Sequence, residues 1–205
     1  MKGLSLLFLI VLAVCAPASA KNRQIASPDV DKVYKALGSG DWVAAGNSAR
    51  SLIKRNSPAQ RNLIARMRYI YLYALSKQLE KRELSFSDFK NKINLVLKKD
   101  VLQPWHPIKS ESNTCFNYIC NSEKQENILT TTQTSNAGTQ IYSFEYFDVG
   151  YPLDVSSFDG QNARLGGVLE KIEINDNLGP ALKAHSGVSW YLRLHFQDAY
   201  MQYER

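Results

Sequence analysis

The chain has 205 residues, 44% of them hydrophobic, and a formal net charge of +6. After one short apolar run near the N-terminus, no stretch is long and apolar enough to span a membrane, which takes about 20 apolar residues. The few cysteines and the three scattered histidines do not offer the four clustered ligands of a zinc site, and we expect neither a metal nor a cofactor.

The first 20 residues have the three parts of a secretory signal peptide. Lys2 supplies a positive charge, Leu4–Val14 is a mostly apolar run, and Ala18-Ser19-Ala20 places small residues before a cleavage site. We therefore expect export to the periplasm or the cell exterior, with cleavage after Ala20 leaving no transmembrane segment.

A second interpretation of this region involves Cys15. The tetrapeptide Leu12-Ala13-Val14-Cys15 resembles the lipobox of bacterial lipoproteins, in which a lipidated Cys15 would become the first residue. That motif normally has a small residue immediately before the cysteine, whereas Val14 is bulky. Cleavage after Ala20 is therefore the favoured prediction, and the lipoprotein is the minor alternative.

Cleavage leaves two cysteines, Cys115 and Cys120. A matched pair in an exported protein predicts one disulfide bond, because that compartment is oxidising. The loop that the bond would close is short, so its contribution to stability should lie well below the ~3 kcal/mol expected for a 15-residue loop.

The charge of the chain changes sign near Asp100. Residues 21–100 carry 17 Lys and Arg against 7 Asp and Glu, a balance of +10. Residues 101–205 carry 7 against 12, a balance of −5. The hydrophobic pattern changes at the same place, so we expect a basic region over residues 21–100 and an acidic region over residues 101–205.

The basic region shows apolar residues at the spacing of helices. The predicted helices begin near Ser27 or Asp29, after Asp41, at Ser57 and at Ser85, and the long third helix runs to about Arg82. Small polar residues at these starts suit helix N-caps.

The acidic region shows the β-branched and aromatic runs of strands. Strands are predicted over Ile128–Thr132, Gln140–Phe147, Gly167–Ile174 and Val188–Phe196. In the third of these strands, alternation predicts that Val168, Glu170, Ile172 and Ile174 share one face. In the fourth, it predicts that Trp190, Leu192, Leu194 and Phe196 share one face. The expected fold class is α+β, with antiparallel helical hairpins packed on an antiparallel sheet.

The segments Gly40-Asp41-Trp42-Val43-Ala44-Ala45 and Asn56-Ser57-Pro58-Ala59 resemble the turn and the inter-repeat loop of tetratricopeptide (TPR) repeats. The resemblance covers residues 28–99, although the long third helix departs from a 34-residue period. It implies paired helices and a groove that binds peptides or partner proteins.

One flank of the third helix has the composition of a binding surface. A helical wheel places Leu63, Met67 and Ile70 on the core face and five other residues on roughly the opposite face. These five residues are Asn62, Arg66, Tyr69, Tyr73 and Lys77. Amide, guanidinium and phenol groups in a line could hold an extended chain or an anionic ligand, so we expect all five to be at least partly exposed. The alternative is that Tyr69 and Tyr73 pack beneath the sheet.

The positive charge of the basic region could serve to face an anionic envelope surface, an acidic partner, or the acidic half of its own chain. We favour the acidic half as part of the explanation. Nucleic acid is disfavoured because the Lys and Arg residues form no recognisable binding module. The expected function is therefore that of an exported, non-enzymatic interaction protein that binds a protein or an envelope component.

A small exported hydrolase or ligand-binding enzyme, with its site in the acidic half, is the alternative. His185-Ser186, His195 and Asp198 could form a triad, but a triad is defined by geometry and not by proximity in sequence. Calcium could be bound by the loop acids, which are more simply explained as turn residues because their spacing matches no EF-hand. These acids are Asp148, Asp154 and Asp159.

Cleavage after Ala20 can be measured directly. Intact-mass and N-terminal analysis of the exported protein should find Lys21 as the first residue, because Ala18 and Ala20 occupy the two small-residue positions. A lipidated Cys15 at the N-terminus would contradict this prediction.

Overall fold

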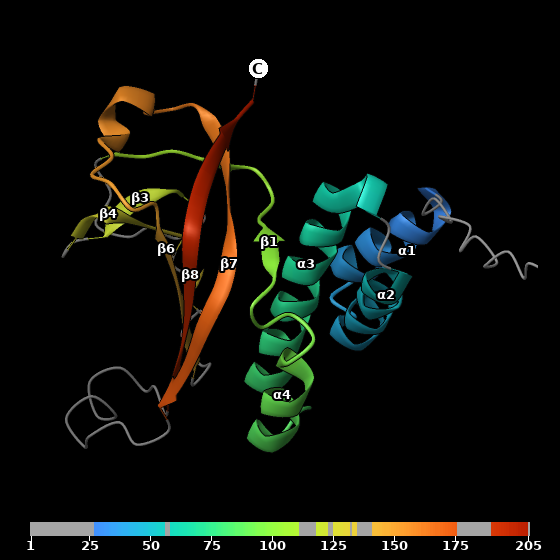
Figure 1. The fold of residues 1–205 in the computed structure, drawn as a ribbon. Helices are drawn as coiled ribbons and strands as arrows, with labels where there is room; N and C mark the ends of the chain where they lie inside the picture. Colours follow the sequence, from blue (N-terminus) through green and yellow to red (C-terminus); the bar gives the residue numbers. More distant parts are fainter. Residues whose placement is uncertain are drawn as a thin grey trace, which may run out of the picture.

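The computed structural model describes residues 27–55, 58–110, 118–122, 125–131, 133–134, 141–175 and 190–204. Helices fill the N-terminal half of this chain and strands the C-terminal half, which confirms the α+β fold class. In Figure 1 the helices stand beside the sheet, and α3 is the helix next to strand β1.

The helical layer follows the predicted order. The elements are α1 (Ser27–Gly38), α2 (Trp42–Arg55), the 3₁₀ turn η1 (Pro58–Gln60), α3 (Arg61–Glu80) and α4 (Phe86–Ile93). Their starts are chemically defined, since Asp41 Oδ1 accepts a hydrogen bond from Ala44 N at 2.9 Å and Ser85 Oγ accepts one from Asp88 N at 3.1 Å. The third helix begins after a 3₁₀ turn, a few residues later than predicted, and ends before Arg82, whose φ of 60° lies in the left-handed region. None of the described helices is long and apolar enough to cross a membrane.

The described strands form one sheet in the order β1-β7-β8-β6-β4-β3, with β2 paired to β7 and β5 paired to β6. Their bounds are β1 (Asp100–Leu102), β2 (His106–Pro107), β3 (Cys120–Ser122), β4 (Gln125–Thr130), β5 (Gln133–Thr134), β6 (Ile141–Asp148), β7 (Asn162–Asn175) and β8 (Trp190–Tyr203), and the 3₁₀ turn η2 spans Val155–Phe158.

The sheet is mixed and not wholly antiparallel as expected. β8 is antiparallel to β7 but parallel to β6, with Glu145 opposite Leu194 and Phe147 opposite Phe196. The reason is topological, because the last strand inserts between β6 and β7 instead of adding at an edge. Sequence alternation reports which face a residue occupies but not the direction of the neighbouring strand.

The alternation predicted for β8 is confirmed for Leu192, Leu194 and Phe196, which are all buried. The predicted alternation of β7 is wrong in part, because Leu169 is fully buried whereas Val168 is only half-buried. The register shift between Leu169 and Lys171 inserts a residue in β7 and changes the phase along this strand, whereas the shift between Gly166 and Val168 inserts one in β8. Each shift inserts a residue on one strand, so side chains beyond it face the other side.

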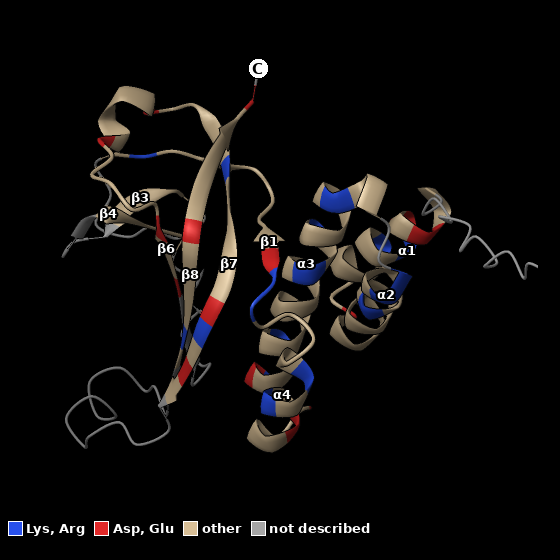
Figure 2. Cartoon of the chain, in the orientation of Figure 1, with Lys and Arg blue, Asp and Glu red and all other residues tan. Residues whose placement is uncertain are grey.

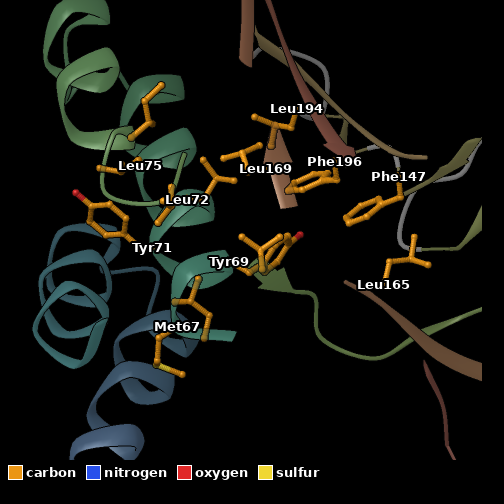
Figure 3. Close-up of a cluster of buried hydrophobic side chains, with 14 of the residues drawn as sticks. Met67, Tyr69, Tyr71, Leu72, Leu75, Phe147, Leu165, Leu169, Leu194 and Phe196 are labelled. Atoms are coloured by element: carbon orange, nitrogen blue, oxygen red, sulfur yellow. The ribbon is translucent and has the colours of Figure 1, made fainter. Parts of the chain in front are cut away.

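A continuous apolar core joins the two halves. From α3, Tyr69 and Leu72 point toward Leu169, Leu194 and Phe196 of the sheet, while Met67 and Tyr71 point the other way, toward the remaining helices (Figure 3). Within the sheet, the rings of Phe147 and Phe196 stack with centroids 4.2 Å apart. The helix α3 is therefore buried from both sides.

This packing predicts that residues 21–100 do not fold alone. Without the sheet, the face of α3 that carries Tyr69 and Leu72 is uncovered, so the fragment should aggregate or lack a cooperative thermal transition in circular dichroism. The control is residues 21–205, which should melt in one transition. A monomeric fragment with its own sharp transition would show that the halves are independent domains.

Candidate functional site

The structure divides the five residues predicted as a binding flank. Asn62 is exposed, and Arg66, Tyr73 and Lys77 are half-buried. Tyr69 is only 4% exposed, so the prediction that all five are at least partly exposed is wrong for this residue. The physical reason is that the sheet covers the side of α3 from which Tyr69 projects, which a helical wheel of α3 alone does not show. We call Asn62, Arg66, Tyr73 and Lys77 the α3 flank.

The opposite side of α3 packs closely on α2. Gly46 of α2 makes the close approach possible, since a Cβ atom there would lie 3.6 Å from Ala74 Cβ and 3.3 Å from Gln78 Nε2. The Gln78 amide also donates a hydrogen bond to the carbonyl oxygen of Trp42 at 3.0 Å. This contact fixes the start of α2, and therefore Trp42, beside the α3 flank.

Aromatic rings and ammonium groups alternate along this part of the flank. The rings of Trp42 and Tyr73 meet edge to face with centroids 5.7 Å apart. Lys77 lies over the Tyr73 ring and Lys81 over the Trp42 ring, each 5.7 Å from the centroid. Such cation–π contacts are worth ~0.5–1 kcal/mol each when exposed, so they orient the lysines more than they stabilise the fold.

The ionisable side chains of the α3 flank differ in charge and in their partners. Burial raises the pKa of Tyr73, and the neighbouring Lys77 opposes that rise, so the phenol stays a neutral hydrogen-bond donor near pH 7. Lys77 also forms an ion pair with Glu80 at 2.7 Å. By contrast, the buried Nε of Arg66 has no hydrogen-bond partner within the described residues. Of the two cations of the α3 flank, Arg66 is therefore the one without a carboxylate partner among the described residues.

A fully buried polar cluster lies where Tyr69 enters the sheet. The Tyr69 hydroxyl donates to Glu145 Oε1 at 3.0 Å, and the Thr131 hydroxyl donates to Glu145 Oε2 at 2.6 Å. The Gln103 amide donates to Glu145 Oε2 and to Thr131 Oγ1. Glu145 is 3% exposed and Gln103 is not exposed at all. We call these four residues the Glu145 cluster.

Burial dominates the electrostatics of this cluster. It raises the pKa of Glu145 from its ordinary value of 4.5 to about 7, although hydrogen bonds from Thr131, Tyr69 and Gln103 act in the opposite direction. Burial, together with the charge of Glu145, also raises the pKa of Tyr69 well above its usual value. The cluster therefore holds one carboxyl group that titrates near neutral pH among donors that do not.

Sequence reasoning missed Glu145, although the sequence contains a signal for it. Glu145, Phe147 and Val149 alternate in phase, and all three are buried. An acidic residue in phase with the apolar face of a predicted strand indicates a buried carboxylate. Gln103 has no comparable signal, because it follows a strand of only three residues and its role depends on a residue 42 positions away.

Few of the helical cations are paired with the acidic half. Across the layers, the described ion pairs are Arg61 with Asp100 at 3.7 Å and Lys98 with Glu170. Glu173 is contacted instead by cations of its own sheet, Lys171 and Arg193. In the cartoon of Figure 2, the blue segments that mark lysine and arginine occur on all four helices. Asp100 itself belongs to the basic region, residues 21–100, so Lys98 with Glu170 is the one described ion pair that joins the basic region to the acidic region.

The loop acids occupy turn positions, as the simpler interpretation expected. Asp148 Oδ1 accepts from Gly150 N at 2.9 Å, Asp154 caps η2 through Ser156 N, and Asp159 Oδ1 accepts from Ser110 N at 2.6 Å. No group of three or more metal-ligating side chains occurs among the described residues.

The remaining predicted residues give no catalytic grouping to test. His195 stacks on Tyr146 with centroids 5.5 Å apart and lies 3.6 Å from Glu173. His185 and Ser186 lie outside the described residues. Cys115 does too, so the Cys115–Cys120 disulfide stays a prediction, with Cys120 buried at the start of β3.

Comparison with known proteins gives no match to a family model, a curated protein or a solved structure. The resemblance to TPR repeats therefore rests on the turn residues alone.

Alanine substitution separates the buried and exposed members of the predicted set of five. Tyr69→Ala should cost on the order of 3 kcal/mol of unfolding free energy, because it removes a buried ring and a donor to Glu145. Asn62→Ala, on the same helix but exposed, should change it by less than about 0.5 kcal/mol. Chemical denaturation of both variants tests this, and equal effects would contradict the burial of Tyr69.

Proposed function

We propose that the protein is an exported, non-enzymatic binding protein whose α3 flank, with Trp42 and Lys81, engages an acidic segment of a partner protein. Export rests on the signal features of Met1–Ala20. Binding rests on the residues of the helical layer, and no observation among the described residues favours the hydrolase alternative.

The observation that carries the proposal is the uncompensated charge of the helical layer. Besides the paired cations, seven exposed lysines and arginines have no carboxylate partner in the part of the chain that the structure describes. They are Lys35, Arg50, Lys54, Lys81, Lys90, Lys92 and Lys99. Such a surplus attracts anionic partners over a range of about 10 Å at moderate salt.

The flank supplies the specific contacts. Arg66 offers a half-buried guanidinium group without a carboxylate partner among the described residues, Tyr73 offers a neutral phenol, and Trp42 offers a half-buried indole ring. Arginine, tyrosine and tryptophan are the residue types most often responsible for binding energy at interfaces. The carboxylates of an acidic peptide are natural acceptors for these donors.

An extended peptide fits this surface better than a lipid bilayer. Arg66, Tyr73 and Lys77 are half-buried, so a flat membrane surface reaches them less readily than a flexible chain does. A single extended chain can bring its carboxylates to half-buried groups one at a time. Binding to anionic lipid is therefore the competing outcome of the experiment below.

The test is affinity capture from a cell-envelope fraction with wild-type protein, Arg66→Ala and Arg50→Ala, each checked by thermal melting. Arg50 is the matched control, because it is an exposed arginine on α2 outside the flank. Arg66→Ala should weaken capture by about 30-fold, corresponding to ~2 kcal/mol, with little change in melting.

Two outcomes would contradict the proposal. An equal loss for Arg50→Ala would mean that general charge, and not the flank, is responsible. Binding of the wild type to phosphatidylglycerol vesicles without capture of any protein would assign the surface to lipid.

A further inference from the structure

The geometry points to a protonation-controlled latch, the Glu145 cluster, that fastens the helical layer to the sheet more firmly in mildly acidic than in alkaline conditions. This inference does not depend on what the α3 flank binds.

The cluster joins four separate segments at a single carboxyl group. Glu145 belongs to β6, Tyr69 to α3, Gln103 follows β1 and Thr131 follows β4. Tyr69 provides the only member from the helical layer, through its 3.0 Å hydrogen bond to Glu145 Oε1. A change in the charge of Glu145 therefore acts directly on the contact between α3 and the sheet.

No cation compensates the carboxylate within the described residues. The titratable groups that face it come from α3 and are the phenols of Tyr69 and Tyr73. From β8, its register partner is the apolar Leu194. The next residue, His195, contacts Tyr146 and Glu173 instead. The ionised form consequently depends on neutral donors alone.

The Gln103 amide is the part of the cluster whose hydrogen bonds would change with the protonation state of Glu145. Its amide nitrogen donates to Glu145 and Thr131, as the ionised carboxylate requires, but its Oε1 is buried without a hydrogen-bond partner among the described residues. A proton on Glu145 creates a new donor. Rotation of the amide would then turn Oε1 toward that donor, but it would also take the NH2 group away from Glu145 and Thr131. Each protonation state thus leaves one side of the Gln103 amide without a partner among the described residues, and the cost of burying the ionised carboxylate decides between the two states.

The direction in which stability changes with pH follows from the raised pKa of Glu145, which is about 7 in the folded protein against an ordinary 4.5. Between these values the folded state holds a proton that the unfolded state has released. The stabilisation is therefore complete below about pH 4.5 and is lost as pH rises through 7. The latch is closed at mildly acidic pH and loosened above neutrality.

The first measurement is the pH dependence of unfolding for wild type, Glu145→Gln and the control Glu83→Gln, which is exposed. Relative to Glu145→Gln, the folding equilibrium constant of the wild type should fall about 70-fold from pH 5 to pH 8. Glu83→Gln should follow the wild type. Parallel profiles for wild type and Glu145→Gln would overturn the proposal.

The second measurement is the titration of the Glu145 carboxyl carbon by NMR, assigned by its loss in Glu145→Gln. A midpoint near pH 7 is expected, and one below pH 5.5 would overturn the latch. If Glu145→Gln does not fold, Tyr69→Phe serves instead. It keeps the ring and removes one donor to the ionised form, so it should move the midpoint upward, and an unchanged midpoint would contradict the assigned contact.

Hydrogen exchange then tests whether titration moves the layers. Corrected for intrinsic rates, amides of α3 and β6 should be less protected at pH 8 than at pH 5.5 in the wild type, with no such difference in Glu145→Gln. Equal protection in the wild type at both pH values would show that Glu145 titrates without acting as a latch.

Discussion

The burial of α3 on two opposite sides is the constraint on which the rest of the structure depends. One side packs on α2 through Gly46 and Ala74, and the other packs on the sheet through Tyr69 and Leu72. Each fully buried leucine or aromatic side chain contributes about 1.5–3 kcal/mol. The two described ion pairs that cross the layers involve exposed lysine and arginine and contribute at most about 1 kcal/mol each. Apolar packing, and not the opposite charges of the halves, holds the layers together.

This result changes the meaning of the charge asymmetry. The opposite signs of residues 21–100 and 101–205 suggested that the halves attract each other, but most cations of the helices remain at the surface. A basic surface that the fold does not need is available to another molecule. Because both broad faces of α3 are covered, its contribution to such a surface is limited to its flank, where Arg66 and Tyr73 are half-buried.

Local features of the fold could be predicted from the sequence, whereas contacts between distant segments could not. The caps at Asp41 and Ser85 and the buried positions of β8 depend on nearby residues, and they were found where expected. The register shifts in β7 and the parallel pairing of β6 with β8 depend on which strands become neighbours. The burial of Tyr69 has the same origin, because a helical wheel gives the faces of a helix but not what covers them.

The Glu145 cluster adds a cost that the fold alone does not explain. A buried carboxylate without a cation is destabilising when ionised, and an apolar residue of similar size would pack in its place at less cost. The position of Glu145 links this cost to the proposed binding surface. Tyr69, which contacts Glu145, lies one helical turn before Tyr73 on the flank, and a helix moves as a rigid element over that length. Any displacement of α3 that follows ionisation of Glu145 would therefore shift Tyr73 and Arg66 relative to the sheet. The protonation state of the core and the shape of the proposed binding flank are in this way two properties of one helix.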